Sequence, residues 1–353
     1  MDTHIVEELA QLVADGDIDA EYINVESEHS AMAACIGAQA TGVRTYTATC
    51  GQGLAYMWEL LYIASGMRLP LVMGVTNRAL SAPLNIWGDW SDIMGARDTG
   101  WIHLFCENVQ EAFDTTIQAY RIAEDRKILL PVTVNIDGFW LSHVYEPLDL
   151  LENVEGFLGD YKPPFRLDPK NPISIGEYAT PENYQEFRQT QQEAIERSKN
   201  VIGQVNAEFF KKFGRKYGSG LIDTYNMPAK NVIVSMGSIC GTIKHVIEQN
   251  KIKDVGLVRI RSFRPFPGEE LAKILSDAES VGVLEKDICP GLGGALCSEV
   301  KNFAGVPVSN FVGGLGGRDI TIPQIKMVFD KIRKKSTGLN WIGESSPSQG
   351  IKM

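Results

Sequence analysis

The sequence predicts an α/β protein in which a doubly wound domain with a parallel sheet precedes a second, smaller α/β unit. Helix-like and strand-like segments alternate from residue 1 to about residue 143. The runs LPLVMGVTN (69–77) and LLPVTVNID (129–137) are almost continuously apolar, which is typical of strands buried on both faces of a parallel sheet. The alternation resumes at residue 231, after a stretch interrupted by prolines.

The first domain is assigned to residues 1–145. It is expected to contain an amphipathic helix at 3–14, an extended segment at 22–25, an alanine-rich helix at 30–40 and a short strand at 44–49. A glycine turn, Gly51-Gln-Gly53, then leads into an apolar helix at 54–65 that ends at Gly66. The two apolar runs supply the remaining strands of this sheet.

Residues 146–229 are assigned to a linker that carries a long polar helix at 182–213, with a loop at 214–228. The second domain, 230–353, begins with NVIVSMGS (231–238), a strand followed by a glycine turn. Helices at 242–250 and 269–275 and strands within 255–267 and 280–287 continue a βαβ pattern. A glycine-rich stretch (315–321) and a basic tail (326–335) follow.

Composition and charge exclude several classes of function. The chain has 353 residues, a net charge of −10 and a pI near 5.1, so it lacks the excess of basic residues that binds nucleic acid. No apolar run is long enough for a membrane span and the N-terminus is acidic, so a cytoplasmic location is expected. The six cysteines form no CxxC pair, which argues against a disulfide framework, a zinc site or an iron–sulfur cluster on this chain.

Three loops are expected at the carboxyl ends of first-domain strands, where open α/β sheets bind ligands. They are VESEHS, TATCGQG and the long segment from TNRAL to WGDWSD. Together they supply Glu28, a glycine turn and Arg78. An arginine suits a carboxylate substrate because it donates two parallel hydrogen bonds. Glu28 begins a helix of small residues, so its carboxylate is expected to be partly desolvated or paired, which suits it to hold a proton.

Structural roles remain open for the same residues. Considered by itself, Glu28 is better explained as a carboxylate at a helix start, which the helix macrodipole favours, than as a catalyst. Considered by itself, an arginine such as Arg78 is more often part of a structural ion pair. Several other polar and aromatic residues are interpreted as structural: His29 and His143, Asp89 and Asp92 as turn caps, and Trp87, Trp90 and Trp101 as core or interface anchors. The glycine-rich stretches 291–294 and 313–319 are interpreted as turns.

Several sequence motifs occur along this chain in the same order as in one known protein family. VESEHSAMAACIGAQATGVRTYTAT, TNRALSAPLNIWGDWSD and NIDGFWLSH, followed by YKPPF, ATPENY, VSMGSICGTIK, RIRSFRPFP and VSNFVGGLGGRDIT, resemble the α subunit of pyruvate:ferredoxin oxidoreductase. The resemblance covers nearly the whole chain. It implies a thiamine-diphosphate enzyme that decarboxylates pyruvate oxidatively, reduces ferredoxin and forms acetyl-coenzyme A, or runs in reverse. It also implies a pyrimidine-binding first domain and a second domain like the C-terminal domain of transketolase.

The resemblance assigns residue roles. Glu28 corresponds to the catalytic glutamate that hydrogen-bonds N1′ of the aminopyrimidine ring, and Arg78 to the arginine that receives the 2-oxoacid carboxylate. Thr49, Cys50, Gly51 and Gln52 fall in the cofactor-binding loop. Cys50-Gly51 stands where Ser-Ser is usual, and we expect its thiol to be an inert small hydrophobe rather than an oxidation-sensitive site.

The resemblance also implies partners. The chain lacks the GDG motif that holds Mg²⁺ and the diphosphate, so these are expected on a β subunit, with the cofactor between the chains. Iron–sulfur clusters are expected on β and on a ferredoxin-like δ subunit, beside a γ subunit. The family usually begins with a further strand and a YPITPQT-like loop. We favour a truncated sequence or a misassigned start over a true loss, which would open a sheet edge beside the cofactor.

Three alternatives stay open. The same chemistry could act on a branched-chain, aryl or oxalate-type 2-oxoacid. The chain could instead be the β-like component of an NAD-linked 2-oxoacid dehydrogenase, which shares the two-domain arrangement. It could also be a non-catalytic assembly subunit.

Overall fold

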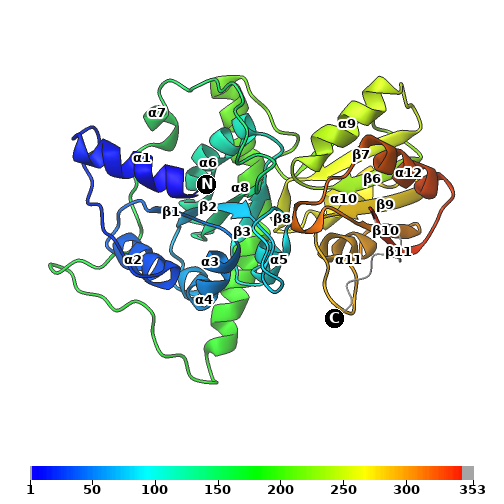
Figure 1. Cartoon of the computed structure of the whole chain (residues 1–353). Helices are drawn as coiled ribbons and strands as arrows, with labels where there is room; N and C mark the ends of the chain where they lie inside the picture. The colour runs from blue at the N-terminus through cyan, green and yellow to red at the C-terminus, as the bar shows by residue number, and fades with distance from the viewer. Residues whose placement is uncertain (1, 344–353) are drawn as a thin grey trace.

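The computed structural model describes residues 2–343, without the side chains of residues 2–5, and contains two β-sheets that lie in separate units, side by side (Figure 1). The first sheet has the order β1-β2-β4-β3-β8, formed by Tyr46–Thr49, Val72–Asn77, Val132–Asp137, Ile102–Phe105 and Ser262–Arg264. The second has the order β11-β10-β9-β6-β7-β5, formed by Gly338–Trp341, Val308–Val312, Ser280–Glu285, Asn231–Ser235, Val255–Ile260 and Ile222–Tyr225. Both sheets are parallel except for β8 and β5, which pair antiparallel at an edge.

Helices cover the first sheet because its strands are apolar on both faces. They are α2 (Glu28–Ala40), α3 (Gly51–Tyr56), α4 (Trp58–Gly66), α5 (Ser91–Gly95) and α6 (Val109–Ala123), with α1 (Asp2–Ala14) at the N-terminus. Ser27 caps α2 by accepting a hydrogen bond from the Ser30 N–H, and Asn108 caps α6 by accepting one from the Glu111 N–H. The capped starts fix where α2 and α6 leave the preceding loops.

The middle of the chain forms an extended arm and a long helix. After α7 (Glu155–Leu158) the arm runs around the first unit, and α8 (Tyr184–Phe213) then packs against α4 and α6 (Figure 1). Gly214 ends α8 in the left-handed conformation that glycine adopts without strain. The buried face of α8 includes Ala194, Val201 and Phe209, so the helix is part of the core as well as a polar arm.

Helices also cover the second sheet: α9 (Ile239–Gln249), α10 (Gly268–Ile274), α11 (Ala295–Lys301) and α12 (Ile322–Arg333), with a short 3₁₀ turn at Leu315–Gly317. One hydrophobic cluster contains residues of both units, such as Met32 and Val283. The arrangement confirms the predicted fold class of two α/β units with parallel sheets.

Several expected elements differ from the structure. Residues 22–25 form no strand, and the loop expected at 214–228 contains β5, which pairs with β7. The basic tail at 326–335 is largely α12, because Ile325, Val328, Phe329 and Ile332 make one buried face. The strands β3, β10 and β11 were not among the expected elements.

The two units are joined by more than the linker. Although β8 lies in the segment assigned to the second domain, it extends the first sheet by pairing with β3. Conversely, β5 lies in the segment assigned to the linker and completes the second sheet. The boundaries at 145 and 229 stay a prediction. Among the residues that the structure describes, none of the helices combines the length and apolarity that a membrane span requires.

Candidate active site

The segment Thr49–Gly53 lies where β1 ends, and two predicted site residues flank it. A Cβ placed on Gly53 would lie 3.0 Å from Glu28 Oε1, and one placed on Gly51 would lie 3.0 Å from Arg78 Nε. Gly51 has a φ of +50°, a conformation in which glycine carries no side-chain strain. The glycines therefore let the backbone pass between a carboxylate and a guanidinium, at the edge where β1 and β2 end.

Glu28 is the first residue of α2, and its side chain is exposed. The expectation that it is partly desolvated is wrong for this chain. The buried residues of α2 are Met32, Ile36, Gln39 and Ala40, so the small-residue packing begins one turn after Glu28. The carboxylate stands at the N-terminus of α2, where the helix dipole interacts favourably with a negative charge.

Arg78 is half-buried directly after β2. Its Nη2 donates a hydrogen bond of 3.1 Å to Gln52 Oε1. Within residues 2–343, Arg78 Nε and Gln52 Nε2 are buried without a hydrogen-bond partner. No carboxylate of the described chain pairs with Arg78, so a structural ion pair does not explain it. Unused buried donors are costly unless a ligand satisfies them.

Asp92 joins the loops that follow β1 and β2. Its Oδ2 accepts hydrogen bonds from the N–H groups of Gly51 and Arg78, each 2.9 Å long. Its Oδ1 accepts from the Ile93 N–H at 2.7 Å and from Asn77 Nδ2 at 3.3 Å. Burial raises the pKa of Asp92 to about 7, although the backbone hydrogen bonds oppose the shift.

Neighbouring residues of the WGDWSD segment (Trp87–Asp92) attach it to the second unit. Asp89 Oδ2 accepts a hydrogen bond from the Gly316 N–H at 3.0 Å, and the Trp90 N–H donates to the Lys286 carbonyl at 2.9 Å. Trp90 Nε1 donates to Asp137 Oδ1 at 2.6 Å. Asp89 and Asp92 therefore accept backbone hydrogen bonds, as expected for turn caps, and they also link distant segments.

Asp137 forms a second junction, at the end of β4. Burial alone would raise its pKa, but the charge of Lys286 and hydrogen bonds from Ser238 and Trp90 outweigh burial and hold the pKa below its usual value. Lys286 Nζ lies 3.2 Å from Asp137 Oδ2, and both side chains are buried. This pair fixes the end of β4 against the end of β9.

The remaining sequence candidates lie in structural settings. His29 Nε2 is 3.8 Å from Glu59 Oε2, and His143 stacks on Phe139 with ring centroids 4.2 Å apart. Trp90 and Trp101 are buried in the core, as expected, whereas Trp87 is half-exposed and its ring lies 5.7 Å from that of Phe139. These contacts are with other side chains of the protein, as expected for structural residues.

The residues around Gly51 and Gly53 fit one side of a cofactor site. The two glycines are buried and let Arg78, Thr49 and Glu28 lie close to the backbone, Thr49 is itself buried, and Cys50 is half-buried before the start of α3. In the described part of the chain, no group of three or more His, Cys, Asp or Glu side chains is placed to hold a metal ion. The donors and acceptors here suit an organic heterocycle and a carboxylate.

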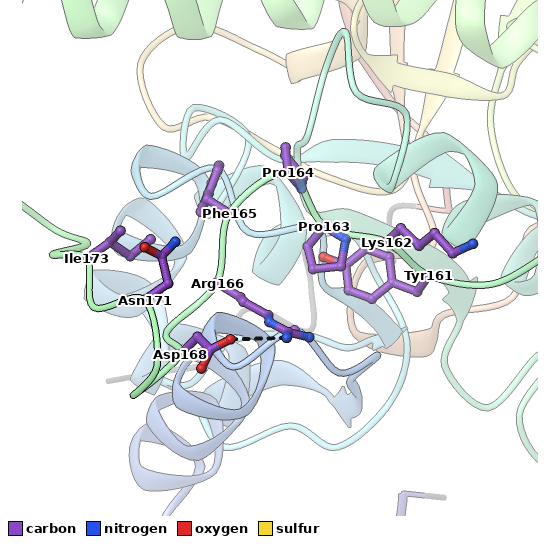
Figure 2. Close-up of a pocket in the computed structure, with 10 residues that line it drawn as sticks. Tyr161, Lys162, Pro163, Pro164, Phe165, Arg166, Asp168, Asn171 and Ile173 are labelled. Carbon is purple, nitrogen blue, oxygen red and sulfur yellow. Dashed lines mark hydrogen bonds and ion pairs between the residues drawn. The ribbon is translucent and has the colours of Figure 1, made fainter.

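A surface pocket lies elsewhere, where the arm crosses the far end of α2 (Figure 2). It has a volume of about 400 Å³ and is lined by Tyr161, Arg166, Asp168 and neighbouring arm residues. Gln39 Nε2 donates to Tyr161 Oη at 2.9 Å, which ties the arm to the last turns of α2. Because α2 rises about 1.5 Å per residue, this pocket is about 18 Å from Glu28 along the helix.

Comparison with protein families agrees with the motifs. The profile described as "Pyruvate flavodoxin/ferredoxin oxidoreductase, thiamine diP-bdg" matches residues 2–207. The chain belongs to the pyruvate:ferredoxin oxidoreductase family. A second profile of this family, "Pyruvate:ferredoxin oxidoreductase core domain II", matches residues 229–325. The predicted family is confirmed, and the chain is a subunit of the 2-oxoacid:ferredoxin oxidoreductase class of enzymes.

Two curated members of the pyruvate:ferredoxin oxidoreductase family show the range of relatives. Pyruvate synthase subunit PorA of Methanocaldococcus jannaschii is 52% identical over 97% of this chain and 90% of that protein. Ketoisovalerate oxidoreductase subunit VorA of Pyrococcus abyssi is 42% identical over 94% of this chain and 86% of that protein. Both names denote subunits, so such chains work within larger assemblies.

Two solved structures share the fold of this family member. A 2-oxoglutarate:ferredoxin oxidoreductase from Magnetococcus marinus, with 2-oxoglutarate, coenzyme A and succinyl-CoA bound, superposes with a TM-score of 0.67. It is 17% identical, and the match covers 94% of this chain and 60% of that one. A split-gene transketolase, in an inactive β4 tetramer, gives a TM-score of 0.50 at 13% identity over 87% of this chain and 82% of that one. The predicted likeness to transketolase is confirmed at the level of the fold.

Proposed function

We propose that this chain is the α subunit of a pyruvate:ferredoxin oxidoreductase and contributes half of its thiamine-diphosphate site. The observation that carries the proposal is the placement of Glu28 and Arg78 on either side of the Thr49–Gly53 segment. When bound, thiamine diphosphate supplies a nucleophilic carbon and an electron sink for decarboxylation of a 2-oxoacid.

The chain's own residues have distinct tasks in this proposal. Glu28 would share a proton with ring nitrogen N1′ of the aminopyrimidine, and a partner chain covering its exposed face would strengthen that hydrogen bond by excluding water. Arg78 receives the carboxylate of the 2-oxoacid, for which its buried Nε is an available donor. Thr49, Cys50, Gly51 and Gln52 would line the cofactor side, where Gly51 lets the Arg78 side chain lie close to the backbone.

The rest of the site is assigned to partners. A β subunit would supply Mg²⁺ and the groups that hold the diphosphate. The β subunit and a ferredoxin-like δ subunit would hold the iron–sulfur clusters that pass electrons to ferredoxin. A γ subunit completes the assembly, and coenzyme A accepts the acyl group. The cytoplasmic location stays a prediction.

A second 2-oxoacid is a candidate substrate besides pyruvate. The relative named ketoisovalerate oxidoreductase is 42% identical to this chain, so a branched-chain substrate is the runner-up to pyruvate. The pyruvate synthase relative, at 52% identity, favours pyruvate. Aryl and oxalate-type substrates, an NAD-linked component and a non-catalytic subunit have no comparable support.

Anaerobic purification of the native complex through a tag on this chain tests the proposal. We expect cluster-bearing subunits to copurify and ferredoxin to be reduced when pyruvate and coenzyme A are both present. Replacing pyruvate with 2-oxoisovalerate identifies the substrate. Reduction with 2-oxoisovalerate alone would make pyruvate the wrong substrate, and a complex without cluster-bearing partners would contradict the subunit assignment.

A further inference from the structure

We propose that Asp92 is a positioning residue that holds Arg78 in register with the Gly51 backbone, and so sets where the 2-oxoacid carboxylate binds. The inference rests on the proposed role of Arg78. It concerns a residue that touches neither the cofactor loop side chains nor the substrate in this scheme. Asp92 acts only through the backbone of the two loops it joins.

The geometry makes Asp92 a shared anchor. One oxygen, Oδ2, accepts hydrogen bonds from both the Gly51 N–H and the Arg78 N–H, each 2.9 Å long. The two loops are therefore held together by a single shared acceptor atom. The carboxylate is 3% exposed, and water therefore does not replace these bonds. Arg78 also contacts the same segment through its side chain, by the hydrogen bond from Nη2 to Gln52.

The anchor is itself held in place. Asp92 is the second residue of α5, and the first, Ser91, accepts a hydrogen bond through Oγ from the Leu80 N–H at 3.0 Å. Trp90, just before α5, is fully buried and bonded to Asp137 and to the Lys286 carbonyl. These contacts fix the position of Arg78 relative to the buried junction between the two units.

An amide at position 92 cannot replace the carboxylate. All four groups that face the Asp92 oxygens are donors: three backbone N–H groups and Asn77 Nδ2. In either orientation of an asparagine, the NH₂ group would oppose two of these donors. Asp92→Asn therefore loosens either the Gly51–Arg78 link or the start of α5, with little change in volume.

The test measures steady-state kinetics of the purified complex with pyruvate, coenzyme A and ferredoxin. Asp92→Asn is expected to raise the KM for pyruvate by about 10- to 100-fold, because small misplacements of a binding group have effects of that size. The KM for coenzyme A should stay unchanged. Asp114→Asn is the matched control, since Asp114 is equally buried but bonds Arg215 and Tyr217 instead. It should lower the melting temperature and leave the KM for pyruvate unchanged.

A double-mutant cycle with Arg78→Ala separates the possible failures. If Asp92 acts through Arg78, Asp92→Asn adds little to the KM in the Arg78→Ala background. Additive effects, or equal effects of Asp92→Asn and Asp114→Asn on KM, would overturn the positioning role. An unchanged KM in Arg78→Ala would instead overturn the proposed role of Arg78. Should Asp92→Asn fail to assemble, Asp92→Glu keeps the charge, displaces the acceptor and is expected to show the same selective rise in KM; a wild-type KM in that variant would contradict the inference.

Discussion

Glu28 and Arg78 could be predicted from the sequence as candidate site residues. Their closeness to the Thr49–Gly53 segment depends on Gly51 and Gly53, which leave room for both side chains. Gly53 matters because Thr49 Oγ1 and Glu28 occupy the space that a side chain would need. Asp92 was visible only as a turn cap. Its joint hold on Gly51 and Arg78 could not be predicted, because it depends on backbone N–H groups that come from different segments of the sequence.

Gly53→Ala tests this close packing. The new Cβ would lie 2.6 Å from Thr49 Oγ1 and 3.0 Å from Glu28, so we expect unfolding free energy to fall by about 1–3 kcal/mol. Gly37→Ala, in the interior of α2, is the control, because no atom lies within 4 Å of its Cβ position. It should gain about 0.5–1 kcal/mol, as alanine does over glycine in helices. Urea unfolding measures both, and a neutral or stabilising Gly53→Ala would contradict the packing argument.

At the scale of elements, the strands β2 and β4 could be predicted from their long apolar runs, whereas several short strands could not. β3 and β5 have four residues each, and β5 is only partly buried, so neither stands out without its partner strand. The helix α12 shows apolar residues at helical spacing, and its lysines obscured that pattern. Contacts between elements from different units could not be predicted, because they depend on how the two sheets meet.

The contact between α6 and β7 contains a buried charge cluster. Glu111 on α6 bonds Arg259 Nη1 at 2.7 Å and also bonds Arg261, and all three side chains are at most 3% exposed. Burial alone would raise the pKa of Glu111, but the two arginines outweigh it and lower the pKa to about 2, from an ordinary value of 4.5. The charged pairings therefore stabilise the contact above about pH 4.5, and this stabilisation is lost as the pH falls through about 2.

Glu111→Gln should be strongly destabilising, because it removes the buried carboxylate that pairs with Arg261 and leaves Arg259 only its pairs with Glu107 and Asp223. We expect a loss of about 3–5 kcal/mol at neutral pH, with a smaller difference from wild type as the pH falls toward 2. Glu208→Gln, which removes the exposed pair with Arg121, should cost about 1 kcal/mol or less. Denaturant unfolding across pH checks both. A Glu111→Gln effect no larger than that of Glu208→Gln would show that the cluster does not hold the units together.

At the scale of the whole molecule, the two units form a support for one face of a site. Strand β8 crosses from the second segment into the first sheet, Lys286 is buried against Asp137, and Gly316 donates to Asp89. The loops that carry Arg78 and the WGDWSD segment are thereby fixed from both units. Glu28, in contrast, is exposed at the start of α2, and in the proposed divided site a partner chain covers it.

The most direct test of the divided site is turnover of the assembled complex with Glu28→Gln. We expect subunit composition to stay unchanged while pyruvate-dependent ferredoxin reduction falls about 100- to 10,000-fold, the usual range for a lost proton-transfer group. Glu186→Gln is the matched control, because Glu186 is also an exposed glutamate in the first turn of a helix. It should turn over at the wild-type rate. A fully assembled Glu28→Gln complex with wild-type turnover would rule out the proposed catalytic role of Glu28 and favour a purely structural role for this chain.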